Sequence, residues 1–190
     1  MAQVGTNDLK AGMKLEIDKD PYNVVGVEFV KPGKGQAFTR TKLKNLKTGR
    51  VVEKTYKSNE KLDLADVEET QMRMLYKEGD GIVFMHDTTY EQLTVPLDVI
   101  DDKEPYMLDD MVYDLVIYKG DVIDVTPPTF LNMTITETAP GVRGDTASGR
   151  VLKPAKTDSG AQIQIPIFIE EGELVKVDTR TGEYVSRVKE

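Results

Sequence analysis

Hydrophobic and polar residues alternate with a period of two along much of this chain. The plainest run places Ile163, Ile165, Ile167 and Ile169 at every second position. This spacing predicts a strand with one buried face. Pro166 interrupts the run, so we expect the strand to lie at a sheet edge or to contain a bulge.

Similar short runs, separated by Gly or Pro, predict four hairpins. Their paired segments are residues 174–177 with 183–187, 113–118 with 121–125, 81–85 with 89–94, and 23–30 with 36–46. Helical signal is confined to residues 97–108, where Pro105 interrupts it. Many short strands with regular turn residues are typical of small all-β barrels.

Two changes in composition divide the chain into three segments of similar length. The second change coincides with Pro127 and Pro128, which cannot both lie inside a helix or a central strand. We therefore predict domains at 1–64, 65–126 and 127–190. Each is close to the lower size limit for an independent core, so we expect closed barrels or mutual packing.

The overall composition excludes several classes of protein. There is no cysteine and a single histidine, His86, so disulfide scaffolds, thiol catalysis and cysteine- or histidine-rich metal sites are excluded or disfavoured. We expect no metal, no cofactor, no catalytic residue and no enzymatic activity. The chain has no run of ~20 apolar residues and no secretory signal at its start, so we expect a cytoplasmic protein without a membrane partner.

The net charge of −8 argues against a simple basic nucleic-acid binder. However, this charge is distributed unevenly. Residues 1–64 carry 13 basic and 8 acidic side chains, residues 65–126 carry 4 and 16, and residues 127–190 carry 8 and 9. The first segment is thus net positive (+5), the second strongly negative (−12) and the third nearly neutral (−1), which indicates three different surfaces.

A basic stretch lies in the first segment, between residues 31 and 57. Glu53 is its only acidic residue, and its cations are Lys31, Lys34, Arg40, Lys42, Lys44, Lys47, Arg50, Lys54 and Lys57. Arg40, Lys42 and Lys44 are two residues apart, so on a strand they project from one face. A basic face beside a basic hairpin indicates contact with phosphates. The alternative, an ordinary solvated strand face, stays open.

The predicted tip of the first hairpin is Lys31-Pro32-Gly33-Lys34-Gly35. Pro32 fixes its own φ, whereas the two glycines flanking Lys34 leave it without bulky neighbours. A phosphate-binding P-loop is excluded, because that motif needs Gly-Lys-Ser/Thr opening a helix. Taken alone, the tip is a weak signal.

Two groups of motifs resemble bacterial elongation factor P, and they extend over essentially the whole chain. The first segment contributes 28–38 (EFVKPGKGQAF) and 52–58 (VEKTYKS). The third contributes 125–128 (VTPP), 144–147 (GDTA), 153–155 (KPA) and 177–187 (VDTRTGEYVSR). The middle segment matches mainly in its pattern.

The resemblance implies a fold and a function. The fold would be an N-terminal SH3-like (KOW-like) barrel followed by two OB-folds, in an L-shaped arrangement like that of tRNA. The function would be binding to the ribosome beside the P-site peptidyl-tRNA, which relieves stalling at consecutive prolines. The partners would be both ribosomal subunits and the peptidyl-tRNA, with the factor acting as a monomer.

The resemblance also implies roles for particular residues. Lys34 matches the position that reaches the peptidyl transferase centre and that modifying enzymes extend by β-lysylation in one branch. Residues 31–35 would contact the tRNA acceptor end, and the basic face for RNA would comprise Arg40, Lys42, Lys44 and Lys54. Gly144, Asp145 and Thr146 would face the small subunit and the mRNA, where a plain turn is the alternative. Tyr184 and Arg187 would contact the anticodon stem, although Tyr184 also suits a barrel interior.

Two other functions remain as alternatives. A generic OB-fold protein that binds single-stranded RNA would need basic grooves with stacking aromatics on the second and third segments, whose summed charge is −13. A carboxylate-based enzyme such as a glycoside hydrolase would need a placed acid pair and a substrate cleft.

Overall fold

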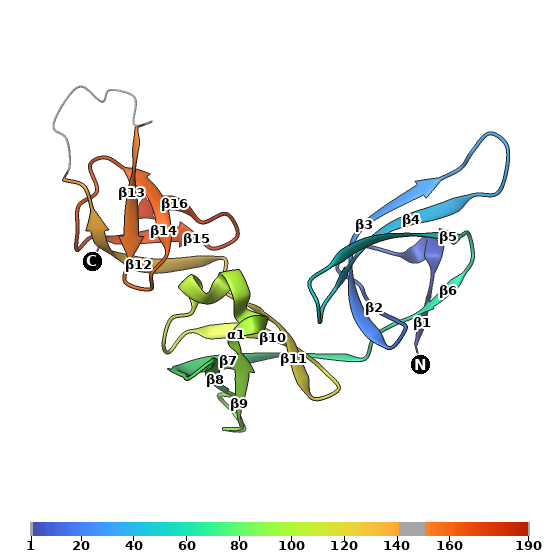
Figure 1. Cartoon of the computed structure of the whole chain (residues 1–190), viewed down its shortest axis with the longest axis horizontal. Coiled ribbons are helices and arrows are strands. Elements are labelled where there is room, and N and C mark those ends of the chain that lie inside the picture. Colours follow the sequence, from blue (N-terminus) through green and yellow to red (C-terminus); the bar gives the residue numbers. More distant parts are fainter. Residues whose placement is uncertain (1, 141–150, 190) are drawn as a thin grey trace. The chain divides into compact units, whose positions relative to one another are not determined.

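The computed structural model describes residues 2–140 and 151–189. Its regular structure is almost entirely β-strand (Figure 1), which confirms the predicted all-β class. The chain divides into two compact units, and each combines segments distant in sequence. The first unit comprises Met1–Thr70 with Leu115–Asp124, and the second comprises Gln71–Asp114 with Val125–Glu190.

A four-stranded antiparallel sheet in the order β2-β3-β4-β5 dominates the first unit. Its strands are β2 (Lys14–Ile17), β3 (Asp20–Val30), β4 (Phe38–Asn45) and β5 (Val51–Lys57). A second small sheet pairs β1 (Gln3–Gly5) with β6 (Lys61–Asp63), and the 3-10 turn η1 (Thr6–Asp8) follows β1. The buried core between these elements consists of Leu9, Leu15, Val24 and Leu43.

The middle of the chain forms a five-stranded sheet in the order β11-β10-β7-β8-β9. Its strands are β7 (Val67–Glu78), β8 (Gly81–Met85), β9 (Gln92–Pro96), β10 (Val112–Tyr118) and β11 (Asp121–Thr126). Between β9 and β10 lie α1 (Leu97–Ile100) and the 3-10 helix η2 (Asp101–Tyr106). The predicted 113–118/121–125 hairpin and the short, proline-interrupted helical segment are therefore both confirmed.

One strand of this sheet begins later than predicted. β9 begins at Gln92 rather than at residue 89. The ring nitrogen Nδ1 of His86 accepts hydrogen bonds from the backbone N–H groups of Thr88 and Thr89 at 3.2 Å, and Tyr90 adopts φ +59°. These hydrogen bonds hold both threonines in the loop, although their β-branched side chains favour strands.

The last sheet belongs to the second unit and has the order β14-β13-β12-β15-β16. Its strands are β12 (Phe130–Thr138), β13 (Leu152–Thr157), β14 (Gln162–Pro166), β15 (Leu174–Asp178) and β16 (Glu183–Arg187). β14 is a terminal strand, so the edge position inferred from Pro166 is confirmed. The strand ends at Pro166, earlier than the isoleucine run suggested, because a turn follows in which the N–H of Ile169 bonds to the Pro166 carbonyl.

Candidate functional site

The β3–β4 hairpin projects from the first unit (Figure 1). Its two strands pair from Tyr22 opposite Asn45 to Val30 opposite Phe38. Of these two strands, β4 alone also pairs with β5. That pairing reaches no further toward the tip than Phe38. Residues 31–37 therefore form a loop at the far end of the hairpin, where the sequence predicts it, but β4 begins at Phe38 rather than at residue 36.

Lys34 lies at this tip, and all five residues from 31 to 35 are exposed. Gly35 adopts φ +107°, a conformation that other residues rarely adopt. A Cβ at Gly33 would meet no atom within 4 Å, so that flank of Lys34 is bare. Within the described part of the chain, no side chain pairs with the Lys34 ammonium. It is therefore available to a partner.

The outer face of β4 carries three of the predicted RNA-binding cations. Arg40, Lys42 and Lys44 are exposed, and they alternate with the buried Thr39, Thr41 and Leu43. The structure thus brings these three together on one face, as their spacing predicts.

Acidic residues from the neighbouring strands share this face. The guanidinium of Arg40 lies 3.1 Å from the carboxylate of Glu28 on β3. Lys42 lies directly opposite Glu53 on β5. Lys44 lies opposite an asparagine and a valine, so it has no acid beside it in the register. The face is therefore less positive than its strand sequence suggests.

Lys54 lies apart from the other three cations. It lies opposite Thr41, whose side chain is buried, so Lys54 occupies the other face of the sheet. Its ammonium is 3.9 Å from the carboxylate of Asp18. Arg40, Lys42 and Lys44 thus form one surface, and Lys54 belongs to another.

A cavity of about 400 Å³ lies beside the base of the tip. The side chain of Phe29, which is 53% exposed, lies at this position on β3. The lining residues are Asn7, Phe29, Val30, Lys31, Ala37, Phe38 and Ser58. Sequence reasoning missed this feature; an aromatic residue two positions before the basic tip was the only available signal.

The two predicted anticodon-stem residues differ in their surroundings. Tyr184 is half-buried and packs against the core of the β12–β16 sheet. Arg187 is exposed, with its guanidinium 2.6 Å from the carboxylate of Glu173 and 5.4 Å from the centre of the Phe168 ring. The predicted loop residues Gly144, Asp145 and Thr146 lie outside the described residues.

A larger groove of about 970 Å³ lies on the β12–β16 sheet, where an OB-type binding site would be sought. Its described lining includes three carboxylates and one cation: Glu137, Glu171, Glu183 and Lys156. The ammonium of Lys156 already lies 3.6 Å from Glu137. Negative charge disfavours RNA phosphates here, which weakens the generic RNA-binding alternative.

Neither a metal centre nor a membrane span is found in the part of the chain that the structure describes. Residues 2–140 and 151–189 contain no group of three or more His, Asp or Glu side chains that could hold a metal ion. No helix among them has the length and apolar character that crossing a bilayer requires.

Comparison with known proteins gives matches along the whole chain. Three family models match in order: the elongation factor P KOW-like domain over residues 5–62, the elongation factor P OB domain over 67–125, and the elongation factor P C-terminal domain over 131–187. "Elongation factor P 2" of Protochlamydia amoebophila is 58% identical over 188 residues, and its namesake in Chlamydia trachomatis is 57% identical. Each alignment covers 99% of both chains.

A solved structure shares the fold. "Eukaryotic translation initiation factor 5A from Methanococcus jannaschii" superimposes with a TM-score of 0.57 at 24% identity, covering 66% of this chain and 92% of that one. The three family models and the full-length relatives together show that the chain is a translation factor. More specifically, the chain belongs to the elongation factor P family.

Proposed function

We propose that this translation factor binds the ribosome beside the P-site peptidyl-tRNA and promotes peptide-bond formation at consecutive prolines. The observation that carries the proposal is the Lys34 ammonium. It is exposed at the end of a projecting hairpin, and no described side chain neutralises it. A cation held in this way can enter a narrow RNA cleft and contact its phosphates.

The chemistry of proline explains why such a factor is needed. Its ring restricts φ and makes its nitrogen a poor nucleophile. Peptide transfer is then slow, and the peptidyl-tRNA can move out of position before the bond forms. A protein that holds the acceptor end restores the geometry of attack, which is an effect of orientation. The reacting groups belong to the ribosome and its substrates, and the factor itself is not an enzyme in this proposal.

The other predicted residues take supporting roles. Segments 1–64, 65–126 and 127–190 act as three modules of a monomer, of which the first approaches the acceptor arm. Arg40, Lys42 and Lys44 contact its backbone, while Lys54 contributes from the other sheet face. Gly144, Asp145 and Thr146 face the small subunit, and Tyr184 with Arg187 contacts the anticodon stem.

Lys34 is also the proposed modification site. A β-lysyl group added by a modifying enzyme would lengthen its reach and add hydrogen-bond donors. Intact mass measurement of protein purified from its own cells tests this directly. An unmodified mass at Lys34 contradicts the modification, but not the ribosomal function.

Synthesis of a reporter containing three consecutive prolines tests the function itself. The natively modified protein should accelerate synthesis, and Lys34→Ala should abolish most of that gain. Lys10→Ala is a matched control, because Lys10 is also an exposed lysine of the first unit. Failure of the native protein to accelerate synthesis overturns the function, and full activity of Lys34→Ala overturns the role of the tip.

A further inference from the structure

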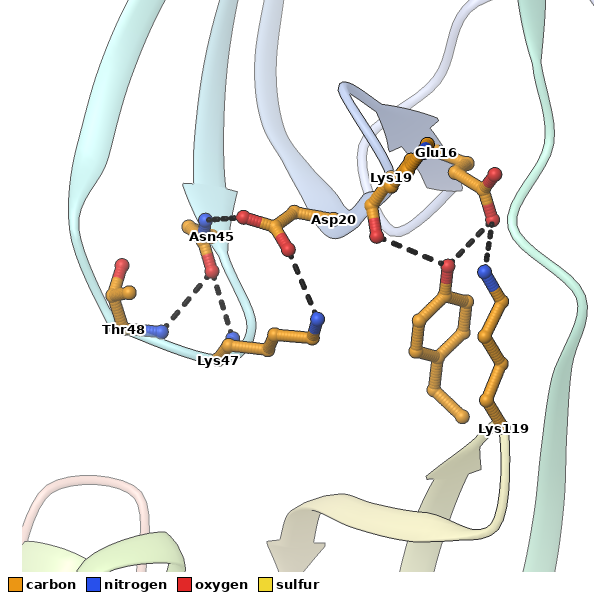
Figure 2. Close-up of polar contacts among 8 residues, drawn as sticks. Glu16, Lys19, Asp20, Asn45, Lys47, Thr48 and Lys119 are labelled. Atoms are coloured by element: carbon orange, nitrogen blue, oxygen red, sulfur yellow. Dashed lines mark hydrogen bonds and ion pairs between the residues drawn. The ribbon is translucent and has the colours of Figure 1, made fainter.

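A polar cluster lies at the root of the Lys34 hairpin, at the end opposite its tip. Three turns of the first unit meet there: the β2–β3 turn, the β4–β5 turn and the tip of the β10–β11 hairpin. Figure 2 shows side chains from all three turned toward one another: Glu16 and Asp20, Asn45 and Lys47, and Lys119.

Tyr118, at the end of β10, lies at the centre of these contacts. It is only 2% exposed. Its phenol donates a hydrogen bond to a carboxylate oxygen of Glu16 at 2.5 Å, and the backbone carbonyl of Lys19 lies 3.4 Å away. A hydrogen bond to a carboxylate is short and strong, especially when water is excluded. The hydrogen bond between Tyr118 and Glu16 joins residues 102 positions apart in sequence.

Two lysines flank the Tyr118 ring. The ammonium of Lys119 lies 4.9 Å from the ring centre and 3.6 Å from the Glu16 carboxylate. The ammonium of Lys47, from the β4–β5 turn, lies 5.9 Å from the same ring centre. Each geometry is within the range of a cation–π interaction. The ring is therefore flanked by Lys47 from the β4–β5 turn and by Lys119 from its own β10–β11 turn.

The β4–β5 turn is itself fixed to the start of β3. The ammonium of Lys47 lies 3.0 Å from one oxygen of Asp20, and the amide of Asn45 donates to the other at 3.3 Å. The side-chain oxygen of Asn45 in turn accepts the backbone N–H groups of Lys47 and Thr48 (Figure 2). The hydrogen bond from Lys47 lowers the pKa of Asp20 below its ordinary value.

The same two strands that start at this cluster carry the Lys34 tip. β3 runs 11 residues from Asp20 to Val30, and β4 returns from Phe38 to Asn45. At about 3.3 Å per residue the hairpin is on the order of 35 Å long. A small change of direction at its root therefore moves the tip by several times as much as it moves the root.

We propose that Tyr118 is a positioning residue, which anchors the root of the Lys34 hairpin to the β10–β11 tip through Glu16 and so fixes the direction of Lys34. This deepens the proposed function, because it rests on Lys34 acting at the acceptor end. An orientation effect requires that the tip be held as well as exposed, since a displacement of about 1 Å can cost on the order of 100-fold in rate.

The anchoring can be measured without any assay of translation. The chain has no cysteine, so Gln36→Cys near the tip and Asp121→Cys on β11 allow a pair of spin labels to be placed. Pulsed electron paramagnetic resonance should give a narrow distance distribution with Tyr118 intact. The distribution should broaden in Tyr118→Phe and broaden further, about twofold, in Tyr118→Ala. Unchanged widths in both variants overturn the anchor.

Tyr90→Phe is the matched control, because it also removes one phenol oxygen but from a side chain that is 71% exposed. It should leave the distance distribution unchanged. Thermal unfolding of each variant shows whether a broad distribution reflects a loose root or an unfolded protein. Tyr118→Phe keeps the buried ring, so it should stay folded even if Tyr118→Ala does not.

The kinetic consequence is tested on the triple-proline template. Because positioning acts after binding, Tyr118→Phe should lower the maximal rate about threefold at saturating factor, with the half-saturating concentration changing less than twofold. A merely destabilised factor would show the reverse: a normal maximal rate reached only at higher concentration. That result, or no loss at all, overturns the positioning role. If the unaltered factor gives no acceleration, the proposed function fails, while the label distances still decide whether Tyr118 anchors the root.

Discussion

Arg40 and Glu28 face each other across β3 and β4, with 3.1 Å between the guanidinium and the carboxylate. Both side chains are exposed, at 49% and 63%. Exposed pairs of this kind contribute at most about 1 kcal/mol to folding. The pair therefore matters mainly for the charge on this face of the hairpin.

Releasing Arg40 from this pair should strengthen binding to the ribosome. Glu28→Gln removes the competing carboxylate, so we expect a higher affinity and a dependence on salt that is steeper by about one in the log–log slope. Arg40→Gln should do the reverse. Binding to ribosomes at several salt concentrations measures both effects. Identical slopes for Glu28→Gln and the unaltered protein would contradict an RNA contact at Arg40.

Much of the fold could be predicted because strands leave a local signal. Alternation with period two identifies β14 directly, and the glycine-containing turn locates the pairing of β15 with β16. Irregular pairing was harder to predict. In β7, the register shifts between Met74 and Tyr76, and such a bulge breaks the alternation on which the prediction depends.

In the candidate site, too, features set within a single strand could be predicted, whereas contacts between strands could not. The spacing within β4 sufficed to place Arg40 and Lys42 on one face, because side chains of a single strand alternate. Whether Lys54 shares that face depends on the register between strands, which the turn at 46–50 sets. The contact between Tyr118 and Glu16 spans 102 positions, and no local pattern encodes such a pair.

Two buried threonines of β4 should respond oppositely to the same substitution. Thr39 and Thr41 are both fully buried, but the hydroxyl of Thr39 has no hydrogen-bond partner within the described structure, whereas that of Thr41 donates to the Lys54 carbonyl at 2.9 Å. Thr39→Val should therefore stabilise the protein by about 1 kcal/mol, and Thr41→Val should destabilise it by a similar amount. Urea unfolding with unchanged slope measures both, and a loss of stability in Thr39→Val would refute the assignment.

The turn between β15 and β16 requires glycine for two separate reasons. Gly182 adopts φ +72°, and a Cβ there would lie 2.9 Å from the phenol oxygen of Tyr106. Gly182→Ala should cost about 1–2 kcal/mol. The control Gly160→Ala has a similar φ of +88° but open space around it, so it should cost less.

Removing the obstructing oxygen separates the two reasons. Tyr106→Phe should recover part of the loss in Gly182→Ala and have little effect in the unaltered protein. The four proteins form a double-mutant cycle, read by chemical unfolding. Additive effects would show that only the backbone conformation matters at this turn.

The buried phenol of Tyr113 donates to the Tyr106 carbonyl at 2.7 Å and accepts the N–H of Leu108 at 2.8 Å. Burial raises its pKa from 10.0 to about 12. Between those values the unfolded chain loses this proton while the folded protein keeps it. Stability should therefore fall as pH rises from 10 to 12, by up to about 1.4 kcal/mol per pH unit from this residue. Tyr113→Phe should be less stable at pH 8, because it lacks both hydrogen bonds, but its stability should fall less steeply with alkaline pH. The urea midpoints of the unaltered protein and of Tyr113→Phe, measured from pH 8 to 12, should therefore converge, because every other tyrosine titrates in both proteins. Parallel curves would show that the phenol of Tyr113 ionises as readily in the folded as in the unfolded protein.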